Sequence, residues 1–238
     1  MPMLLLCPKY TKPMKKDKMS SNTVASVTER RSYWDGIYNN KELASVGWYQ
    51  AFPELSLQLI HKSQLPVTAK IIDVGGGDSL LVDHLLDRGY KDITVLDVSS
   101  RAIEKAKIRL GSRSDLVNWI CSDVTDFEPQ VRYDLWHDRA CFHFMIHKHD
   151  IIAYHSSLNK ALKKDGIFIL GTFSKTGPQK CSGLPVHQYD EKGLRQIFEN
   201  AFDPIGSIRS VHMTPSEAAQ NYVFCTFKNK IEQQAFKY

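Results

Sequence analysis

The feature that most constrains the fold is a glycine turn at the end of a strand-like run. The apolar segment at residues 70–74 leads into Gly75, Gly76 and Gly77, and a helix-like pattern follows. A second apolar segment, at residues 93–96, ends at Asp97, about twenty residues beyond the first glycine. A strand, a glycine turn, a helix and a strand with a terminal acid form a βαβ unit that binds nucleosides. We expect the glycines to let a ligand approach the backbone, and Asp97 to accept hydrogen bonds from both ribose hydroxyls.

The composition of this turn favours a nucleoside that carries no phosphate. A dinucleotide fingerprint needs a third glycine at position 80, which is Leu80 here. Asp78 also lies where a pyrophosphate would rest on the helix N-terminus, and two like charges would repel there. S-adenosylmethionine combines a ribose and an adenine with sulfonium and ammonium charges that suit an acidic loop. The turn therefore predicts S-adenosylmethionine as the cofactor, with a NAD or nucleotide site on a degenerate loop as the alternative.

The net charge of the chain is concentrated at its N-terminus. Residues 1–31 contain seven basic and two acidic side chains, which accounts for the whole net charge of +5, so residues 32–238 are neutral. Nucleic-acid binding depends on neutralising phosphates, and a neutral body therefore argues against a nucleic-acid partner. No apolar run reaches the roughly 18 residues that a membrane-spanning helix requires, so we expect no membrane partner.

We expect one domain at residues 32–228, preceded by a basic, disordered tail at 1–31 and followed by a short tail at 229–238. A mitochondrial presequence is the alternative for the basic tail, but such leaders are usually rich in arginine, and the first 16 residues hold four lysines and no arginine. The five cysteines are scattered and form no C-x-x-C pair, which is typical of free thiols in a reducing compartment. These patterns predict a cytoplasmic protein.

Strand and helix patterns alternate along most of the chain and predict an α/β fold. Residues 33–60 look helical with breaks, and residues 163–166 have the basic side chains and glycine typical of a helix C-terminus. The connection at 212–220 is too short for a crossover helix, so the last two strands should pair antiparallel. The predicted architecture is a doubly wound, mostly parallel seven-stranded sheet with an antiparallel last strand. Strands are expected at 70–74, 93–97, 117–121, 133–137, 166–173, 204–211 and 221–227, and helices at 79–88, 100–109, 149–163 and 190–200.

From about residue 32 to 228 the chain resembles the class I S-adenosylmethionine-dependent methyltransferases. The first family motif corresponds to residues 71–77, and the acid that ends the second strand corresponds to Asp97. The third motif is Cys121-Ser122-Asp123-Val124, and the resemblance implies that its acid meets the adenine amino group. Residues 161–166 are similar to the family's stretch before the fifth strand, with Asp165 in place of its Pro-Gly part.

Two further motifs narrow the resemblance. Trp34-Asp35-x-x-Tyr38 precedes the core, and residues 136–143, W-H-D-R-A-C-F-H, end the fourth strand. Similar motifs occur in thiopurine-methyltransferase-like enzymes and in the methyltransferase-like protein lysine methyltransferases. The lysine enzymes tend to read D-K-G-T-[FL]-D, from which this chain departs at Arg139, Ala140 and His143. The W-D-R-G-A run of the thiopurine enzymes is more similar, apart from one inserted histidine.

The candidate cofactor-binding residues follow from the βαβ unit, the resemblance and the aromatic side chains ahead of the core, which would stack on the sulfonium cation. The alternative for these aromatics is a helix that merely packs on the sheet. The full set is Trp34, Tyr38, Trp48, Asp73, Gly75, Gly76, Gly77, Asp97, Val98, Ser99, Asp123, Val124 and Asp138.

Asp138 and His143 are the candidate catalytic residues, because they follow the fourth strand, where open α/β sheets place their ligands. Asp138 would face the methionyl end of the cofactor or the acceptor, and the alternative is a helix cap. His143 would serve as a general base near neutral pH, and the alternative is a buried or surface histidine with no catalytic role. Methyl transfer from a sulfonium needs mainly alignment, so no catalytic dyad is required.

Two other groups of residues contain side chains that can carry chemistry, a histidine cluster and a loop cysteine. The histidines at 137, 143, 147 and 149 form a cluster, but its spacing does not suggest a third ligand, so no metal is expected. Cys181 lies in a long loop after the fifth strand, and nothing in the sequence around it would depress its pKa, so we interpret it as an ordinary loop cysteine. The loop itself is expected to cover the acceptor.

The sequence predicts an enzyme that transfers a methyl group from S-adenosylmethionine to a small molecule, such as a thiol or another soft nucleophile. Protein lysine methylation is the alternative activity. A catalytically idle partner subunit is a third hypothesis, and the presence of the glycine turn, Asp97 and Asp123 together argues against it.

Overall fold

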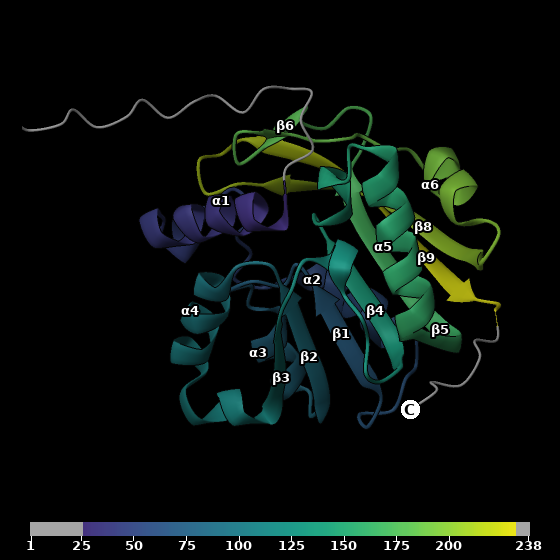
Figure 1. Ribbon diagram of the computed structural model, residues 1–238, viewed down its shortest axis with the longest axis horizontal. Coiled ribbons are helices and arrows are strands. Elements are labelled where there is room, and N and C mark those ends of the chain that lie inside the picture. Colours follow the sequence, from purple (N-terminus) through teal and green to yellow (C-terminus); the bar gives the residue numbers. More distant parts are fainter. Residues whose placement is uncertain (1–25, 232–238) are drawn as a thin grey trace, which may run out of the picture.

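A seven-stranded sheet lies at the centre of the protein, with strand order β3-β2-β1-β4-β5-β9-β8 (Figure 1). The computed structural model describes residues 26–231. Neighbours from β3 to β5 pair in parallel, whereas β9 runs antiparallel to both β5 and β8. This confirms the predicted doubly wound, mostly parallel sheet. The strands are β1 (Lys70–Val74), β2 (Asp92–Asp97), β3 (Val117–Cys121), β4 (Tyr133–Arg139), β5 (Leu162–Phe173), β8 (Phe202–Met213) and β9 (Ala219–Asn229), and a separate small hairpin contains β6 (Lys180–Cys181) and β7 (Leu184–Pro185).

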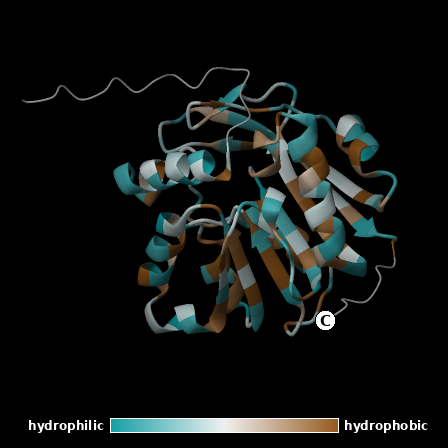
Figure 2. Cartoon of the chain, in the orientation of Figure 1, coloured by the Kyte–Doolittle hydropathy of each residue, from teal (hydrophilic) through white to brown (hydrophobic). Residues whose placement is uncertain are grey.

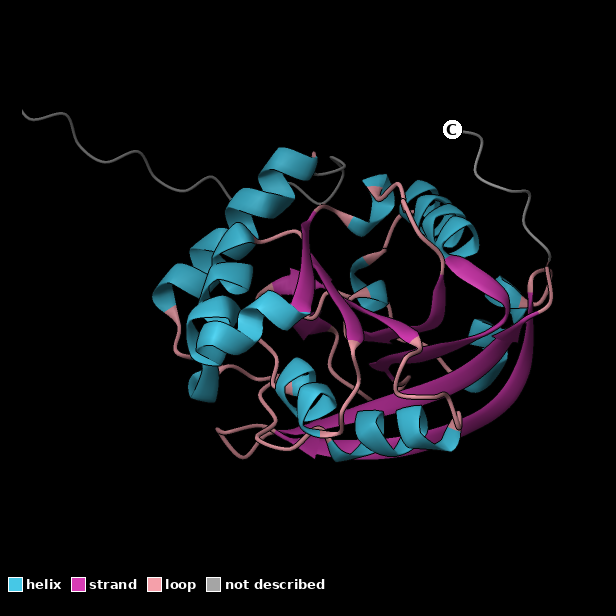
Figure 3. Ribbon diagram, turned by 90° about the horizontal axis from the view of Figure 1, so that it is seen from below, coloured by secondary structure: helices cyan, strands magenta, loops and turns pink. Residues whose placement is uncertain are grey.

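Helices cover both sides of the sheet, as Figure 3 shows from below. The α-helices are α1 (Val27–Asn40), α2 (Glu54–Lys62), α3 (Leu81–Asp87), α4 (Ser100–Leu110), α5 (Lys148–Ala161) and α6 (Glu191–Phe198), and short 3₁₀ turns are η1 (Leu43–Ser45), η2 (Gly111–Leu116), η3 (Val124–Asp126) and η4 (Phe142–Phe144). One apolar cluster joins the sheet to α2 and α3, and the other joins it to α5 and α6.

Successive residues of the central strands face opposite helical layers. Ile71 belongs to the cluster that contains Leu85 of α3, and Ile72 belongs to the cluster that contains Leu158 of α5. Both isoleucines are fully buried, because a parallel strand between two helical layers has no solvent face. Apolar residues therefore occur on both faces of these strands, and they appear as brown bands in Figure 2.

The chain from α5 into β5 differs from the expected helix C-terminus. Helix α5 ends at Ala161, and the basic residues assigned to its last turn already belong to β5. Asp165 has a φ of +62°, and its carboxylate pairs with Lys228 Nζ at 2.8 Å. The pairing of β4 with β5 shifts register between Tyr133 and Leu135. The Lys-Lys-Asp-Gly signal thus marks an irregular strand entry rather than a helix end.

The folded domain begins earlier than the boundary expected at residue 32. Helix α1 starts at Val27, and Ser26 forms a capping box with Glu29. Arg30 Nε lies 2.9 Å from the Asp123 carboxylate, and Arg30 Nη1 donates to Asp150 at 3.0 Å. Residues 26–31, which were assigned to the tail, are therefore part of the fold. The rest of the predicted N-terminal tail, residues 1–25, lies outside the described part of the chain. The same holds for residues 232–238 of the predicted C-terminal tail.

Within residues 26–231, none of the helices combines the length and the apolar character needed to cross a membrane.

A chain that starts at Arg31 is expected to be less stable than one that starts at Val24. Starting at Arg31 removes the capping box and leaves the buried carboxylates of Asp123 and Asp150 without Arg30. The loss in unfolding free energy should be about 1–3 kcal/mol, measured by urea denaturation. The chain that starts at Val24 keeps both features and is the matched control. Equal stability of the two chains would show that the N-terminal part of α1 contributes nothing to the fold.

Candidate active site

A cavity of about 1520 Å³ opens where β1, β2 and β4 end. This is the position at which open α/β sheets bind ligands, because the chain order of the strands reverses beside β1. Gly77, Ser99, Asp138 and His143 are not among the residues that line it. The other predicted site residues do line it, namely Trp34, Tyr38, Trp48, Asp73, Gly75, Gly76, Asp97, Val98, Asp123 and Val124.

The glycine turn after β1 lies against neighbouring chain segments with no room for side chains. Gly75 and Gly77 have φ values of +66° and +52°, which disfavour other residues. A Cβ at position 75 would stand 2.7 Å from Cys141 Cβ, and one at position 77 would stand 2.5 Å from Tyr38 Oη. The amide of Gly75 donates to the carbonyl of Leu96 at 2.8 Å, which fixes the turn beside the end of β2. Gly77 thus shapes the site without lining it.

Asp97 ends β2 at the cavity, as the βαβ pattern predicted. Its carboxylate accepts a hydrogen bond from the Ser99 amide at 2.8 Å and is only 6% exposed. Burial raises the pKa of Asp97 from its ordinary value of 3.8 to about 7, aided by the charges of Asp78 and Asp73 and opposed by the Ser99 amide. The Asp97 carboxylate is already removed from water. It would therefore interact favourably with a ligand that donates hydrogen bonds or carries a positive charge.

Asp123 lies after β3 and holds several donors at once. One carboxylate oxygen accepts from the Thr125 amide and hydroxyl at 2.9 and 2.7 Å, and the other lies 2.9 Å from Arg30 Nε. Arg30 itself lines the cavity. No local sequence pattern indicates this pair, because Arg30 is far from Asp123 along the chain.

Helix α1 forms part of the cavity wall, and Asp35 anchors it to the rest of the domain. The Asp35 carboxylate accepts hydrogen bonds from Ser99 Oγ at 2.6 Å and from the Arg101 amide at 3.2 Å, at the start of α4. This explains the acid of the Trp34-Asp35-x-x-Tyr38 motif. Ser99, a predicted cofactor residue, instead links α1 to the loop after β2.

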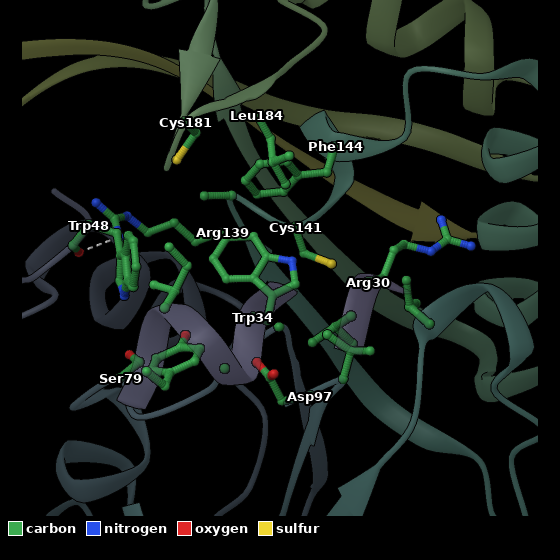
Figure 4. Close-up of a pocket in the computed structure, with 18 of the residues that line it drawn as sticks. Arg30, Trp34, Trp48, Ser79, Asp97, Arg139, Cys141, Phe144, Cys181 and Leu184 are labelled. Atoms are coloured by element: carbon green, nitrogen blue, oxygen red, sulfur yellow. Dashed lines mark hydrogen bonds between the residues drawn. The ribbon is translucent and has the colours of Figure 1, made fainter. Parts of the chain in front are cut away.

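Aromatic side chains from α1 and its neighbours pack together at the cavity (Figure 4). The ring of Trp34 lies 6.1 Å from that of Trp48, 6.3 Å from that of Tyr38 and 5.1 Å from that of Phe144. Packing among aromatic rings stabilises this wall and presents flat apolar surface to a ligand. Phe144 was not identified from the sequence.

The long loop after β5 borders the cavity. The Tyr33 hydroxyl donates a hydrogen bond to the carbonyl of Ser182, between β6 and β7. Cys181 and Leu184 of this hairpin line the cavity (Figure 4), and Figure 1 shows α1 and β6 above the ends of β1 and β2 in that view. Helix α1 and the β6–β7 hairpin therefore form one roof, which we call the cavity roof.

A chain of buried polar side chains lies at the cavity floor. His137 Nδ1 lies 2.7 Å from Asp73 Oδ1, and His137 Nε2 lies 2.9 Å from Ser56 Oγ. All three residues are nearly inaccessible and line the cavity. The chain joins β1, β4 and α2, and it uses one oxygen of Asp73, a predicted cofactor residue. Sequence reasoning placed His137 only in a histidine cluster, and the described residues contain no metal-ligating group of three or more His, Cys, Asp or Glu.

Asp138 occupies a structural position beneath the site. Its carboxylate accepts hydrogen bonds from the Cys141 amide at 2.9 Å, the Phe142 amide at 3.1 Å and the Tyr154 hydroxyl at 2.7 Å. Burial raises the pKa of Asp138 to about 6, although these donors oppose the rise. The side chain is fully buried and does not reach the cavity, so the geometry favours the capping alternative over a catalytic role.

His143 is likewise buried away from the cavity. Its ring lies 4.6 Å from the rings of both Phe144 and Phe173, and neither ring nitrogen has a hydrogen-bond partner. Burial, together with the charge of Arg139, lowers the pKa of His143 to about 3. The imidazole is therefore neutral at physiological pH, and its buried position does not favour a general base that contacts a ligand in the cavity.

Cys141 and Cys181 both line the cavity as protonated thiols. Burial raises the pKa of Cys181 to about 11 and that of Cys141 well above its ordinary value. A thiolate nucleophile is not provided by either side chain, which agrees with the interpretation of Cys181 as an ordinary loop cysteine.

Comparison with known families identifies the central part of this chain. A family profile described as "Methyltransferase domain" matches residues 72–168, which include the glycine turn, Asp97 and Asp123. The mouse (Mus musculus) eEF1A lysine and N-terminal methyltransferase is 32% identical over 109 residues, which cover 45% of this chain and 15% of that protein. The malonyl-[acyl-carrier protein] O-methyltransferase 2 of Ilyobacter polytropus is 29% identical over 106 residues, which cover 44% of this chain and 39% of that protein. The chain thus spans less than half the length of these relatives.

The fold also matches solved structures along most of the chain. The 1,6-didemethyltoxoflavin-N1-methyltransferase of Burkholderia thailandensis superimposes with a TM-score of 0.66 and covers 93% of this chain and 100% of its own. The two sequences are 16% identical, so the likeness is one of fold.

Asp97 and Asp138 are each expected to contribute a loss of stability to the ligand-free protein as the pH rises from about 4 through about 7. Buried His143, with its pKa lowered to about 3, contributes in the opposite direction below about pH 6.5. The folded pKa values of Asp97 and Asp138 are raised to about 7 and about 6, so over this range the folded state holds protons that the unfolded state has released. Above pH 7 both carboxylates must be ionised in a buried position.

The Asp97→Asn variant isolates the share of Asp97 in this pH dependence. Its advantage in unfolding free energy over the wild type should be larger at about pH 8 than at about pH 5, as measured by urea denaturation. Asp115→Asn, at an exposed acid outside the cavity lining, is the control and should show no such change. The same difference at both pH values would mean that Asp97 is ionised normally.

Proposed function

We propose that this chain, as a class I, Rossmann-like S-adenosylmethionine-dependent methyltransferase, acts on a small molecule. It transfers the methyl group of S-adenosylmethionine to this acceptor. The observation that carries the acceptor class is the cavity roof. Tyr33 of α1 bonds to Ser182 of the β6–β7 hairpin above the strand ends, so an acceptor must fit beneath two segments that already contact each other. Such a covered site suits a compact acceptor better than a flat protein surface.

The residues at one end of the cavity fit the proposed cofactor. The glycine turn packs closely against Cys141 and Tyr38, where a side chain at 75 or 77 would collide, and the Asp97 carboxylate lies desolvated beside it. Asp97 would accept hydrogen bonds from the ribose, and Asp123 has lone pairs for the adenine amino group. Asp73 adds a third carboxylate to this end, which suits a ligand with two positive charges.

The cofactor supplies a methyl group on a sulfonium, which is already activated for displacement. The protein then has to align the acceptor and exclude water. The aromatic wall of Trp34, Trp48 and Phe144 packs against the acceptor, and the cavity roof limits the access of water. Neither Asp138 nor His143 is among the residues that line the cavity, so this alignment does not require them to contact the acceptor.

Protein lysine methylation is the second candidate. It is favoured by the local similarity to the eEF1A lysine and N-terminal methyltransferase, although that similarity covers 45% of this chain. A nucleic-acid acceptor is disfavoured, because residues 32–238 carry no net charge and provide no long-range field for phosphates.

We place the protein in a reducing compartment, the cytoplasm, with the mitochondrial matrix as the alternative. This rests on the free thiols of Cys121, Cys141, Cys181 and Cys225.

The acceptor class is tested by incubating the protein with radiolabelled S-adenosylmethionine and cell extract, followed by separation of proteins from small molecules. Label in the small-molecule fraction supports the proposal. Label on one protein band, located at a lysine by mass spectrometry, would replace it with the second candidate. An otherwise identical Gly77→Val preparation is the control for transfer by other enzymes, because a side chain at position 77 collides with Tyr38.

The cofactor site is tested by replacing Asp97. Asp97→Ala removes the acceptor of both ribose hydrogen bonds, and charge-assisted bonds are worth roughly 1.5–3 kcal/mol each. Affinity for S-adenosylhomocysteine should fall at least about tenfold in titration calorimetry, whereas Asp115→Ala should bind as the wild type does. Unchanged affinity in Asp97→Ala would move the cofactor away from this end of the cavity.

A further inference from the structure

Arg139, at the end of β4, is a cation at the cavity for which the described residues provide no acid. Its Nη1 donates to the carbonyl of Trp48 at 3.0 Å, and its guanidinium lies over the ring of Tyr222, 4.9 Å from the ring centre. Its Nη2 is buried and has no hydrogen-bond partner. The ion pairs found between residues 26 and 231 do not include Arg139. The ring of Tyr222 thus contacts one face of the guanidinium, and the Trp48 carbonyl accepts a hydrogen bond from Nη1. The N–H groups of Nη2 remain without an acceptor.

The acids of the cavity are engaged elsewhere, and Glu29 among them accepts a hydrogen bond from the Ser26 amide at the start of α1. Asp123 and Asp150 pair with Arg30, and Asp73 bonds to His137. Asp97 lies beside the glycine turn, and Figure 4 shows it on the opposite side of Trp34 from Arg139 and Cys181. Negative charge therefore gathers at the cofactor end, and none of these carboxylates neutralises Arg139.

Two more cations lie at the Arg139 end. Lys41 and Lys180 line the cavity with exposed side chains. The positive charges of Arg139 and Lys41 both act on Cys181, which places the two cations near the same thiol. Burial nevertheless keeps that thiol protonated, so Cys181 does not supply the missing negative charge.

A partly buried cation without a counter-charge is costly, and a guanidinium matches a carboxylate with two parallel hydrogen bonds. The rings of Trp34, Trp48 and Phe144 stand beside this end and offer flat apolar surface (Figure 4). The combination of a lining guanidinium that has no acidic partner with aromatic walls is suited to a planar molecule that bears a carboxylate.

We infer that the Arg139 end of the cavity binds the acceptor through a carboxylate, so that the acceptor is a small anionic molecule with a planar apolar body. This inference rests on the proposed methyltransferase function and specifies its substrate class. It also opposes the lysine candidate, because a side-chain ammonium would meet Arg139, Lys41 and Lys180 at the end where it must bind.

The inference is tested by binding, without knowledge of the natural acceptor. Calorimetry first measures S-adenosylhomocysteine on the wild-type protein, and the saturated complex is then titrated with benzoate and with benzamide, which has a similar shape and no charge. Benzoate should bind about tenfold or more tightly than benzamide. Arg139→Gln should abolish this preference, and Arg101→Gln, at an exposed arginine paired with Glu104 outside the lining, should keep it.

The outcomes separate the two proposals. If S-adenosylhomocysteine does not bind the wild type, the proposed function fails. If it binds and benzoate shows no advantage over benzamide, or neither probe binds, the carboxylate inference is overturned. Since Arg139 packs on Tyr222, Arg139→Lys serves as the variant that keeps the charge, and it should retain part of the preference for benzoate. Loss of the preference in Arg101→Gln as well would also contradict the inference.

Discussion

The close approach of the Gly75–Gly77 turn to its neighbours determines where every other part of the site lies. The turn is bonded to the end of β2 through Leu96, touches Cys141 after β4, and leaves room at Gly77 only for the hydroxyl of Tyr38. Three strand ends and helix α1 are thereby brought to within contact distance of one loop. Any side chain at these positions would separate the ends and open the cavity between them.

Around this turn the charges are divided along the cavity. Carboxylates gather at the end near β2 and β3, and Lys41, Arg139 and Lys180, which form no ion pair within residues 26–231, lie at the other end. Since like charges repel strongly in a partly desolvated space, the division gives the two ends different preferences for ligands. A cationic nucleoside and an anionic acceptor would then orient each other across the aromatic wall without a dedicated catalytic pair.

Local sequence patterns predicted the parts of the molecule that local interactions determine. The apolar runs located all seven strands of the sheet, and the pattern from Gly75 to Asp97 marked the ends of β1 and β2, which border the cavity. The missed features depend on long-range pairing. Arg30 with Asp123, and Ser56 with His137 and Asp73, are separated by many residues and have no periodic signal. The positions of Asp138 and His143 were ambiguous for a related reason: the sequence placed them after β4 but did not show which way the η4 turn directs their side chains.

The cavity roof has a consequence for how the protein is made. Tyr33 and Ser182 are separated by 149 positions along the chain, so the ribosome must synthesise most of the sheet before the two can meet. Contacts between such distant segments form slowly, because the intervening chain must first be ordered. Helix α1 is synthesised before the sheet, but it can contact the β6–β7 hairpin only after that hairpin has been made. The binding site is therefore completed late in folding, and a nascent chain does not possess it until the β6–β7 hairpin has left the ribosome.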